Sequence, residues 1–195
     1  MILSDRFPAA LLLANHLHRH QTRKGCETPQ ISHPLAVSAM VLEWGGDEDT
    51  AIAALLHDAV EDSGGVPTAE LIRWSFGDRV ADIVLTSSGS VEPAGADQPW
   101  HDRKNAAIAM MGKAPKEVAL VVACDKLNNI TALIRTISRF GTGALWRFSE
   151  PDRLVWYYEA LAEALYPHAG VAPVDELRKR SVQLAEMVHG SPYSE

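Results

Sequence analysis

The 195-residue sequence predicts an all-α fold in one domain, and three observations support this prediction. Apolar residues recur at helical spacing along most of the chain. Several of these stretches open at a proline, which the first turn of a helix tolerates because the missing N–H has no helical partner there. No stretch shows the sustained apolar–polar alternation of a half-buried strand. The length suits one domain with a substantial core better than two small domains.

The helical stretches can be justified in chain order. Apolar spacing predicts helices over residues 7–20, 34–44 and 49–62. Two shorter helices, 68–74 and 77–87, follow, and Thr68 after Pro67 is a plausible helix entry before "AEL". Each of the remaining stretches begins at a proline, which indicates a helix start. These helices cover 99–111, 115–137, 151–166 and 173–188.

The segments between these helices are polar or irregular. Residues 21–33 are polar and turn-rich, and residues 138–150 join two helices. Residues 88–98 combine Gly, Pro and Ala without periodicity, which predicts a mobile loop. The tail from residue 190 is expected to fray.

Composition excludes several classes of function. A hydrophobic content of 47% with 22% charged residues is typical of a soluble globular protein. The formal charge of −7 argues against nucleic-acid binding, although a local basic pocket for a small anion remains compatible with it. No apolar run is long enough to span a membrane, and the N-terminus lacks a signal-peptide pattern, so a cytoplasmic location is expected. Homo-oligomerisation stays open. Cys26 and Cys124 form no CxxC pair, which favours buried or idle thiols.

The stretch "AIAALLHDAVED", residues 51–62, places charged side chains in an apolar helix. Residues three and four apart share a helical face, so His57 lies beneath Glu61 and Asp58 lies beneath Asp62. Buried charges are costly unless another group pairs with them. This patch therefore requires a partner.

Two further segments supply polar groups of the same kind. The apolar stretch "LVVACDKLNNITAL" carries Asp125, with Asn129 one helical turn later, and His33 precedes a helix that Pro34 can open. Two histidines and two aspartates make a suitable ligand set for Mn²⁺, Fe²⁺ or Zn²⁺, and no thiolate is needed. Such an ion would compensate the buried carboxylates and hold three helices together. It would leave Glu61 and Asp62 as bases that face a metal-bound water.

The order of these residues resembles the HD-domain metal-dependent phosphohydrolases. The segments "TRKGCETPQISHPLAV", "AALLHDAVEDS" and "VVACDKLNNI" are similar to motifs of the RelA/SpoT hydrolase domain, especially in the free-standing small alarmone hydrolases. The resemblance covers about residues 5–165. It departs from the family at Gln30, where Tyr is frequent, at Cys124, where Ala is usual, and after Asn129, where an Arg often follows. These departures bear on the substrate rather than on the metal.

The resemblance implies a role for each matching residue. One Mn²⁺ per chain would be held by His33, His57, Asp58 and Asp125. Glu61 and Asp62 would position and deprotonate the water, and Asn129 would contact substrate and water. The implied substrate contacts are Arg23 and Lys24 on the nucleobase and phosphate, Arg103 and Lys104 on a diphosphate, and Arg153 and Tyr157 near the pocket.

The implied reaction is Mn²⁺-dependent removal of pyrophosphate from the 3′ position of an alarmone such as (p)ppGpp. Other nucleotides stay open as substrates: (p)ppApp, the 2′-phosphate of NADPH, or a nucleoside monophosphate. Two non-catalytic readings also remain, a nucleotide-binding module and a helical domain whose metal only joins helices. Glu61, Asp62 and Asn129 favour catalysis, because a protein that only binds a nucleotide has no need of two carboxylates that accept a proton. The sequence leaves base preference and regulation open.

Overall fold

The computed structural model describes residues 2–88, 100–168 and 172–190, and it confirms the predicted all-α class. The predicted mobile loop, apart from Ser88, and the tail beyond Gly190 lie outside the described residues. No strand occurs in the described ranges; the nearest feature is an isolated bridge between Thr22 and Pro29. The α-helices are α1 (Arg6–His18), α2 (Ser32–Glu43), α3 (Glu48–Leu56), α4 (Ala59–Asp62), α5 (Val66–Phe76), α6 (Asp78–Ser87), α7 (Trp100–Met111), α8 (Lys116–Phe140), α9 (Pro151–Leu165) and α10 (Ala172–His189), with 3₁₀ turns at Thr142–Arg147 and Tyr166–His168.

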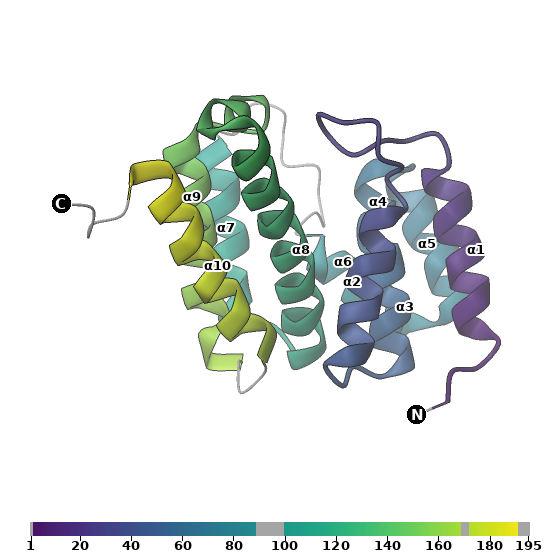
Figure 1. The fold of residues 1–195 in the computed structure, drawn as a ribbon. Coiled ribbons are helices and arrows are strands. Elements are labelled where there is room, and N and C mark those ends of the chain that lie inside the picture. Colours follow the sequence, from purple (N-terminus) through teal and green to yellow (C-terminus); the bar gives the residue numbers. More distant parts are fainter. Residues whose placement is uncertain (1, 89–99, 169–171, 191–195) are drawn as a thin grey trace.

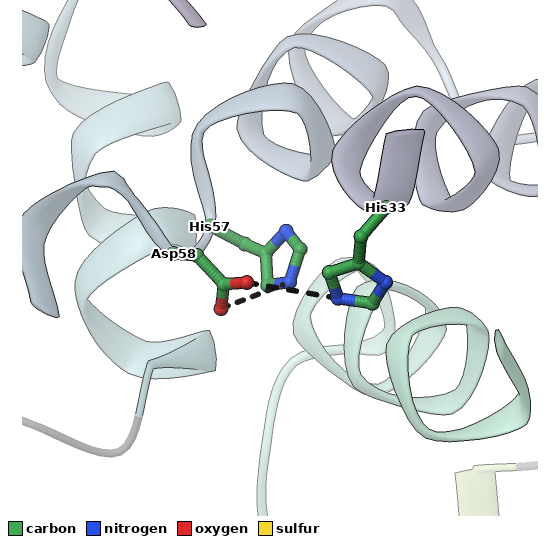
Figure 2. A group of neighbouring side chains, drawn as sticks. All are labelled: His33, His57 and Asp58. Atoms are coloured by element: carbon green, nitrogen blue, oxygen red, sulfur yellow. Dashed lines mark ion pairs between the residues drawn. The ribbon is translucent and has the colours of Figure 1, made fainter. Parts of the chain in front are cut away.

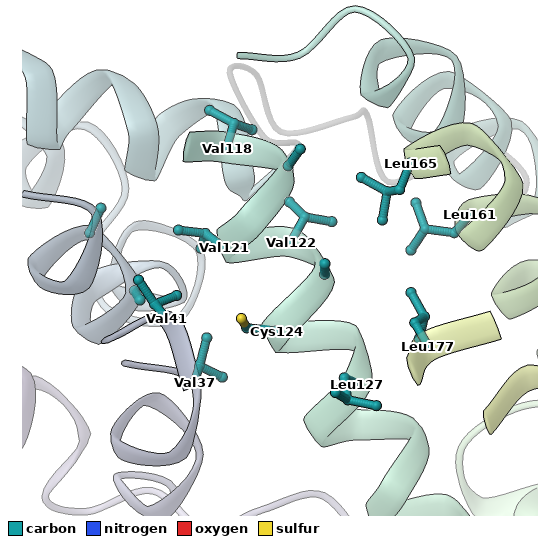
Figure 3. Close-up of a cluster of buried hydrophobic side chains, with 14 of the residues drawn as sticks. Val37, Val41, Val118, Val121, Val122, Cys124, Leu127, Leu161, Leu165 and Leu177 are labelled. Atoms are coloured by element: carbon teal, nitrogen blue, oxygen red, sulfur yellow. The ribbon is translucent and has the colours of Figure 1, made fainter. Parts of the chain in front are cut away.

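Helix α8 runs through the middle of the molecule, with α1 to α6 on one side and α7, α9 and α10 on the other (Figure 1). Residues 118–130 of this helix are all buried or half-buried because both sides cover it. Val121 and Cys124 face Val41 and Val37 of α2, whereas Leu127 faces Leu177 of α10 (Figure 3). Gly141, with φ of 77°, ends the helix in a conformation that suits glycine. A residue in the middle of α8 is therefore buried and fixed in position.

The predicted continuous helix 49–62 is wrong in one respect: it is interrupted at His57 and Asp58, between α3 and α4. Both residues keep right-handed helical dihedrals, and the N–H of Asp62 still donates to the carbonyl of Asp58 at 2.9 Å. The imidazole Nδ1 of His57 lies 2.8 Å from the Ala54 carbonyl, which the N–H of Asp58 would use in an unbroken helix. The polar pair thus sits at a turn rather than along a helical face.

The other helix boundaries differ from the predicted ones by a few residues. The start of α2 at Ser32 is the only shift that affects the site, because it places His33 inside the first turn instead of before the helix. Among the described residues, no helix is long and apolar enough to cross a membrane.

Asp47 caps the helix that leads to the His57–Asp58 turn. Its Oδ1 accepts hydrogen bonds from the N–H and the hydroxyl of Thr50 at 2.9 and 2.6 Å, and its Oδ2 lies 2.7 Å from Arg79. Partial burial opposes ionisation, but the hydrogen bonds from Arg79 and Thr50 outweigh it and lower the pKa of Asp47 to about 2.

We expect Asp47→Ala to lower the free energy of unfolding by roughly 1 kcal/mol at neutral pH, the usual cost of losing an N-cap. Since the pKa of Asp47 is about 2 in the folded chain and 3.8 ordinarily, its stabilisation is complete above pH 4 and is lost as pH falls through 2. Urea unfolding at several pH values measures this. Asp47→Asn is the matched control, because Asn keeps the cap and loses only the charge. Equal stability of Asp47→Ala and the wild type would contradict the assignment.

Candidate metal centre and its pocket

Three potential metal ligands converge where α2 meets the α3–α4 turn (Figure 2). His33 enters from the first turn of α2, and His57 and Asp58 enter from the turn. One ligand atom from each lies within 4.8 Å of the others. Both imidazoles are almost completely buried, with their ring centroids 5.1 Å apart. Neighbouring segments of the sequence therefore place two nitrogens and a carboxylate around one point.

Hydrogen bonds orient both imidazoles with Nε2 toward that point. Nδ1 of His33 lies 2.7 Å from Oδ1 of Asn128, and Nδ1 of His57 lies 2.8 Å from the carbonyl of Ala54. Since each acceptor is an oxygen, each Nδ1 carries the proton, and the lone pair remains on Nε2. This is the usual arrangement of metal-binding histidines.

Nε2 of His57 gives the test of whether an ion fits. It is buried, lies 3.1 Å from Oδ1 of Asp58, and makes no hydrogen bond. A buried polar atom without a partner is rare and costly, and an ion at this point would satisfy it together with the carboxylate. His33, His57 and Asp58 can therefore hold a divalent metal.

Asp125, in the middle of α8, faces the same point from the opposite side. Its Oδ1 lies 3.1 Å from Nε2 of His33 and 3.8 Å from Nε2 of His57. Asn129 donates to Oδ1, and the ammonium of Lys126 pairs with Oδ2. Burial alone would raise the pKa of Asp125, but the ammonium of Lys126 holds it well below its usual range. Asp125 is thus an ionised carboxylate beside the two imidazoles.

Glu61 and Asp62 end the short helix that follows the turn, and their side chains reach solvent. The pKa of Glu61 is raised, first by partial loss of water and then by the charges of Asp58 and Asp62. The pKa of Asp62 is raised by the same loss of water and by Asp58. A carboxylate with a raised pKa is a better proton acceptor than an ordinary one.

A pocket of about 880 Å³ opens beside His33 and Asp62. Arg23 and Lys24, both predicted to contact substrate, line it together with Asn129. Nη2 of Arg23 donates to Oδ1 of Asn129 at 2.6 Å, and the same Asn129 donates to Asp125. Arg23, which is predicted to contact the nucleobase, is thus connected to Asp125 through the amide of Asn129.

Three other predicted substrate contacts, Lys104, Arg153 and Tyr157, do not line the pocket. The ammonium of Lys104 sits over the ring of Tyr157 at 4.8 Å, and neither residue is among those that line the pocket. The charge of Lys104 nevertheless acts on Glu61, where it counters the rise in pKa. Arg153 is exposed and pairs with Glu150 at 3.0 Å. The side chain of Arg103 lies outside the described residues.

Sequence reasoning missed several residues of this site. Asn128 orients His33, although the four-residue spacing from Asp125 favoured Asn129 instead. Tyr158 lines the pocket and its neighbour Tyr157 does not. Arg147 lies in a segment that was predicted only as a connection. The three-residue spacing from Asp125 to Asn128 was the one signal available, because i+3 shares a helical face as well as i+4.

The fold and the ligand arrangement define an HD-domain protein, and a model of the HD domain matches residues 10–139. The chain therefore belongs to the HD-domain family. It is homologous to the SpoT and MESH1 proteins, which confirms the resemblance seen in its three motifs.

Curated relatives carry names from this group. The chain is 38% identical over 137 residues to the guanosine-3′,5′-bis(diphosphate) 3′-pyrophosphohydrolase MESH1 of Xenopus tropicalis, covering 65% of this chain and 72% of the relative. It is 36% identical over 132 residues to the guanosine-3′,5′-bis(diphosphate) 3′-pyrophosphohydrolase of Aquifex aeolicus, covering 67% of this chain and 18% of the relative. A probable GTP pyrophosphokinase of Mycobacterium leprae is 36% identical over 126 residues, 64% of this chain and 15% of that protein. The chain thus spans less than a fifth of the two longer relatives.

Solved structures agree over more of the chain. A metazoan ortholog of SpoT, described as hydrolysing ppGpp, superimposes with a TM-score of 0.75 at 25% identity, covering 96% of this chain and 99% of that one. A protein of Listeria monocytogenes EGD-e superimposes with a TM-score of 0.68 at 27% identity, covering 78% and 97%.

Proposed function

We propose that the protein is a metal-dependent guanosine-3′,5′-bis(diphosphate) 3′-pyrophosphohydrolase. The observation that carries the proposal is the buried, unpartnered Nε2 of His57, which faces Asp58 and lies beside Asp125 at the centre that adjoins the pocket. Relatives named for this reaction share the motifs that build this centre. The proposal requires a nucleotide substrate and neither a nucleic acid nor a membrane. We expect the reaction in the cytoplasm.

In this proposal, His33, His57, Asp58 and Asp125 hold one Mn²⁺. Nitrogen and carboxylate donors without a thiolate suit Mn²⁺, Fe²⁺ or Zn²⁺. The bound ion would polarise a phosphoryl oxygen and acidify water. Mn²⁺ acidifies water less than Zn²⁺, which gives a physical purpose to a separate base.

The residues of the chain supply the proton transfers and the orientation. Glu61 and Asp62 take the proton from the attacking water, and their raised pKa values suit that task. The water oxygen forms a bond to the first phosphorus of the 3′-diphosphate, and the bond from this phosphorus to the ribose 3′-oxygen breaks. Pyrophosphate leaves, and the proton accepted by Glu61 and Asp62 passes to the 3′-oxygen, which becomes a hydroxyl. Asn129, held between Asp125 and Arg23, contacts the substrate beside the reacting phosphorus.

The lining of the pocket fits an anionic nucleotide. Arg23, Lys24, Arg135 and Arg147 contribute positive charge, although the whole chain is acidic at −7. The cations would offset the charge of a multiply phosphorylated substrate, which is usually the largest contribution to such catalysis. The volume of about 880 Å³ lies in the usual range for ligand sites. The distal roles of Arg103, Lys104, Arg153 and Tyr157 stay predictions.

Product analysis tests the reaction. Purified protein with Mn²⁺ should convert ppGpp into GDP and pyrophosphate, because one centre beside Glu61 and Asp62 addresses a single phosphoryl group. Stepwise release of orthophosphate would contradict this placement. Parallel assays with ppApp, NADPH and nucleoside monophosphates measure the preference. If the protein turns over NADPH or a monophosphate and no 3′-diphosphorylated nucleotide, the proposed metal centre stands and the proposed substrate is wrong.

A further inference from the structure

A second buried histidine lies outside the metal centre. His18, the last residue of α1, is 1% exposed, and its Nδ1 lies 2.7 Å from Oε1 of Gln21. Nε2 of Gln21 donates to the carbonyl of Asp62 and to the hydroxyl of Ser63, both at 3.1 Å. Since the NH₂ of Gln21 is used in these two bonds, its oxygen faces His18, and Nδ1 of His18 is the donor. The imidazole therefore fixes the amide of Gln21 in one orientation.

The amide of Gln21 holds the end of α4, the helix that carries the proposed general bases Glu61 and Asp62. Asp62 ends α4, and the carbonyls in the last turn of a helix have no partner within it. With only four residues, α4 is also too short to be stable on its own. The direction of Glu61 and Asp62 therefore depends on bonds from outside, and Gln21 supplies one to the Asp62 backbone. The hydroxyl of Ser63 in turn donates to the carbonyl of Leu17 in α1 at 3.3 Å.

Gln21 also anchors the segment that grips the substrate. Its carbonyl accepts the N–H of Gln30 at 2.9 Å, and Arg23 and Lys24 lie between these two residues. The side chain of Gln30 reaches Oδ2 of Asp58 at 3.4 Å. One residue thus connects the end of α1, the pocket segment and the end of α4.

We infer that His18 and Gln21 are positioning residues that hold Glu61 and Asp62 against the bound nucleotide. This inference rests on the proposed function, because it takes Glu61 and Asp62 as the groups that accept the proton from water. His18 acts through Gln21 and touches neither the substrate nor the ion.

Kinetics of four variants test the inference. Gln21→Ala and His18→Leu should lower kcat by roughly 10- to 100-fold, the scale of a small misplacement of catalytic groups, with metal content within about twofold of wild type. KM should stay within about twofold in His18→Leu and should rise in Gln21→Ala, because Gln21 lines the pocket. His18→Asn should recover most of kcat, because its amide nitrogen can replace Nδ1 as the donor to Gln21. His16→Leu is the matched control, since His16 is exposed on the same helix. An unchanged kcat in Gln21→Ala, loss of metal, or failure of His18→Asn to recover would overturn the inference.

Amide exchange gives a readout that needs no substrate. The N–H groups of Asp62, Ser63 and Gly65 bond to the carbonyls of Asp58, Ala59 and Val60. Their hydrogen exchange should speed up in Gln21→Ala and His18→Leu and stay at the wild-type rate in His18→Asn. If exchange follows this pattern but wild-type protein turns over no alarmone, the positioning holds and the proposed function fails. If wild type is active and exchange is equal in all variants, the positioning fails and the function stands.

Discussion

His57→Ala should lose the bound ion and reduce alarmone hydrolysis by more than about 100-fold. Removal of a residue that only hydrogen-bonds to a metal ligand already costs up to about 100-fold, and removal of the ligand itself should cost more. His57 supplies a buried Nε2 that makes no hydrogen bond, and the methyl group of alanine has no atom that could coordinate in its place. Metal analysis after purification measures the occupancy. His16→Ala, on the exposed side of α1, should keep the ion.

Thermal unfolding with and without a chelator extends this prediction. An ion at about 100 times its dissociation constant adds roughly 2.7 kcal/mol to the stability of the folded state. Wild-type protein should therefore lose stability when the chelator is added, and His57→Ala should show no response. Full occupancy in His57→Ala would remove this residue from the ligand set.

Glu61→Gln and Asp62→Asn should keep the ion and lose activity by roughly 100-fold or more, the usual scale for a general base. Each replacement preserves shape and removes the proton acceptor. Metal content and kcat are measured together for both variants. Glu70→Gln is the matched control, because Glu70 is an exposed carboxylate on the next helix, α5. Loss of metal in either variant would make that residue a ligand, and full activity in both would place the base elsewhere.

The helices were predictable because their apolar faces are local features of the sequence. Helix α8 is an example, since its periodic apolar residues are visible without knowledge of what covers them. The interruption at His57 was not predictable in the same way. The backbone dihedrals there remain helical, and the change depends on a side-chain contact to the Ala54 carbonyl.

The centre was more predictable than the pocket. His57, Asp58 and Asp125 are polar exceptions in apolar stretches, His33 comes just before a proline that can open a helix, and the structure brings the four together. The pocket depends on segments distant in sequence, such as Arg147 beside Gly25, where the Arg147 guanidinium donates to the Gly25 carbonyl at 3.1 Å. Helical spacing carries no information about such contacts. That Tyr158 rather than Tyr157 lines the cavity was hidden for the same reason, since only the packing of α9 on its neighbours decides which ring faces it.

The central position of α8 links ion affinity to the cohesion of the whole molecule. In the proposed ligand set, Asp125 comes from α8, and the other three ligands come from α2 and the α3–α4 turn. Separation of α8 from α2 would therefore break the coordination sphere, and by mass action a bound ion must suppress such opening. Binding of the ion therefore stabilises the contact of α8 with α2 and the α3–α4 turn. Any solute or substitution that separates α8 from α2 should lower the affinity for the ion, even where it touches no ligand.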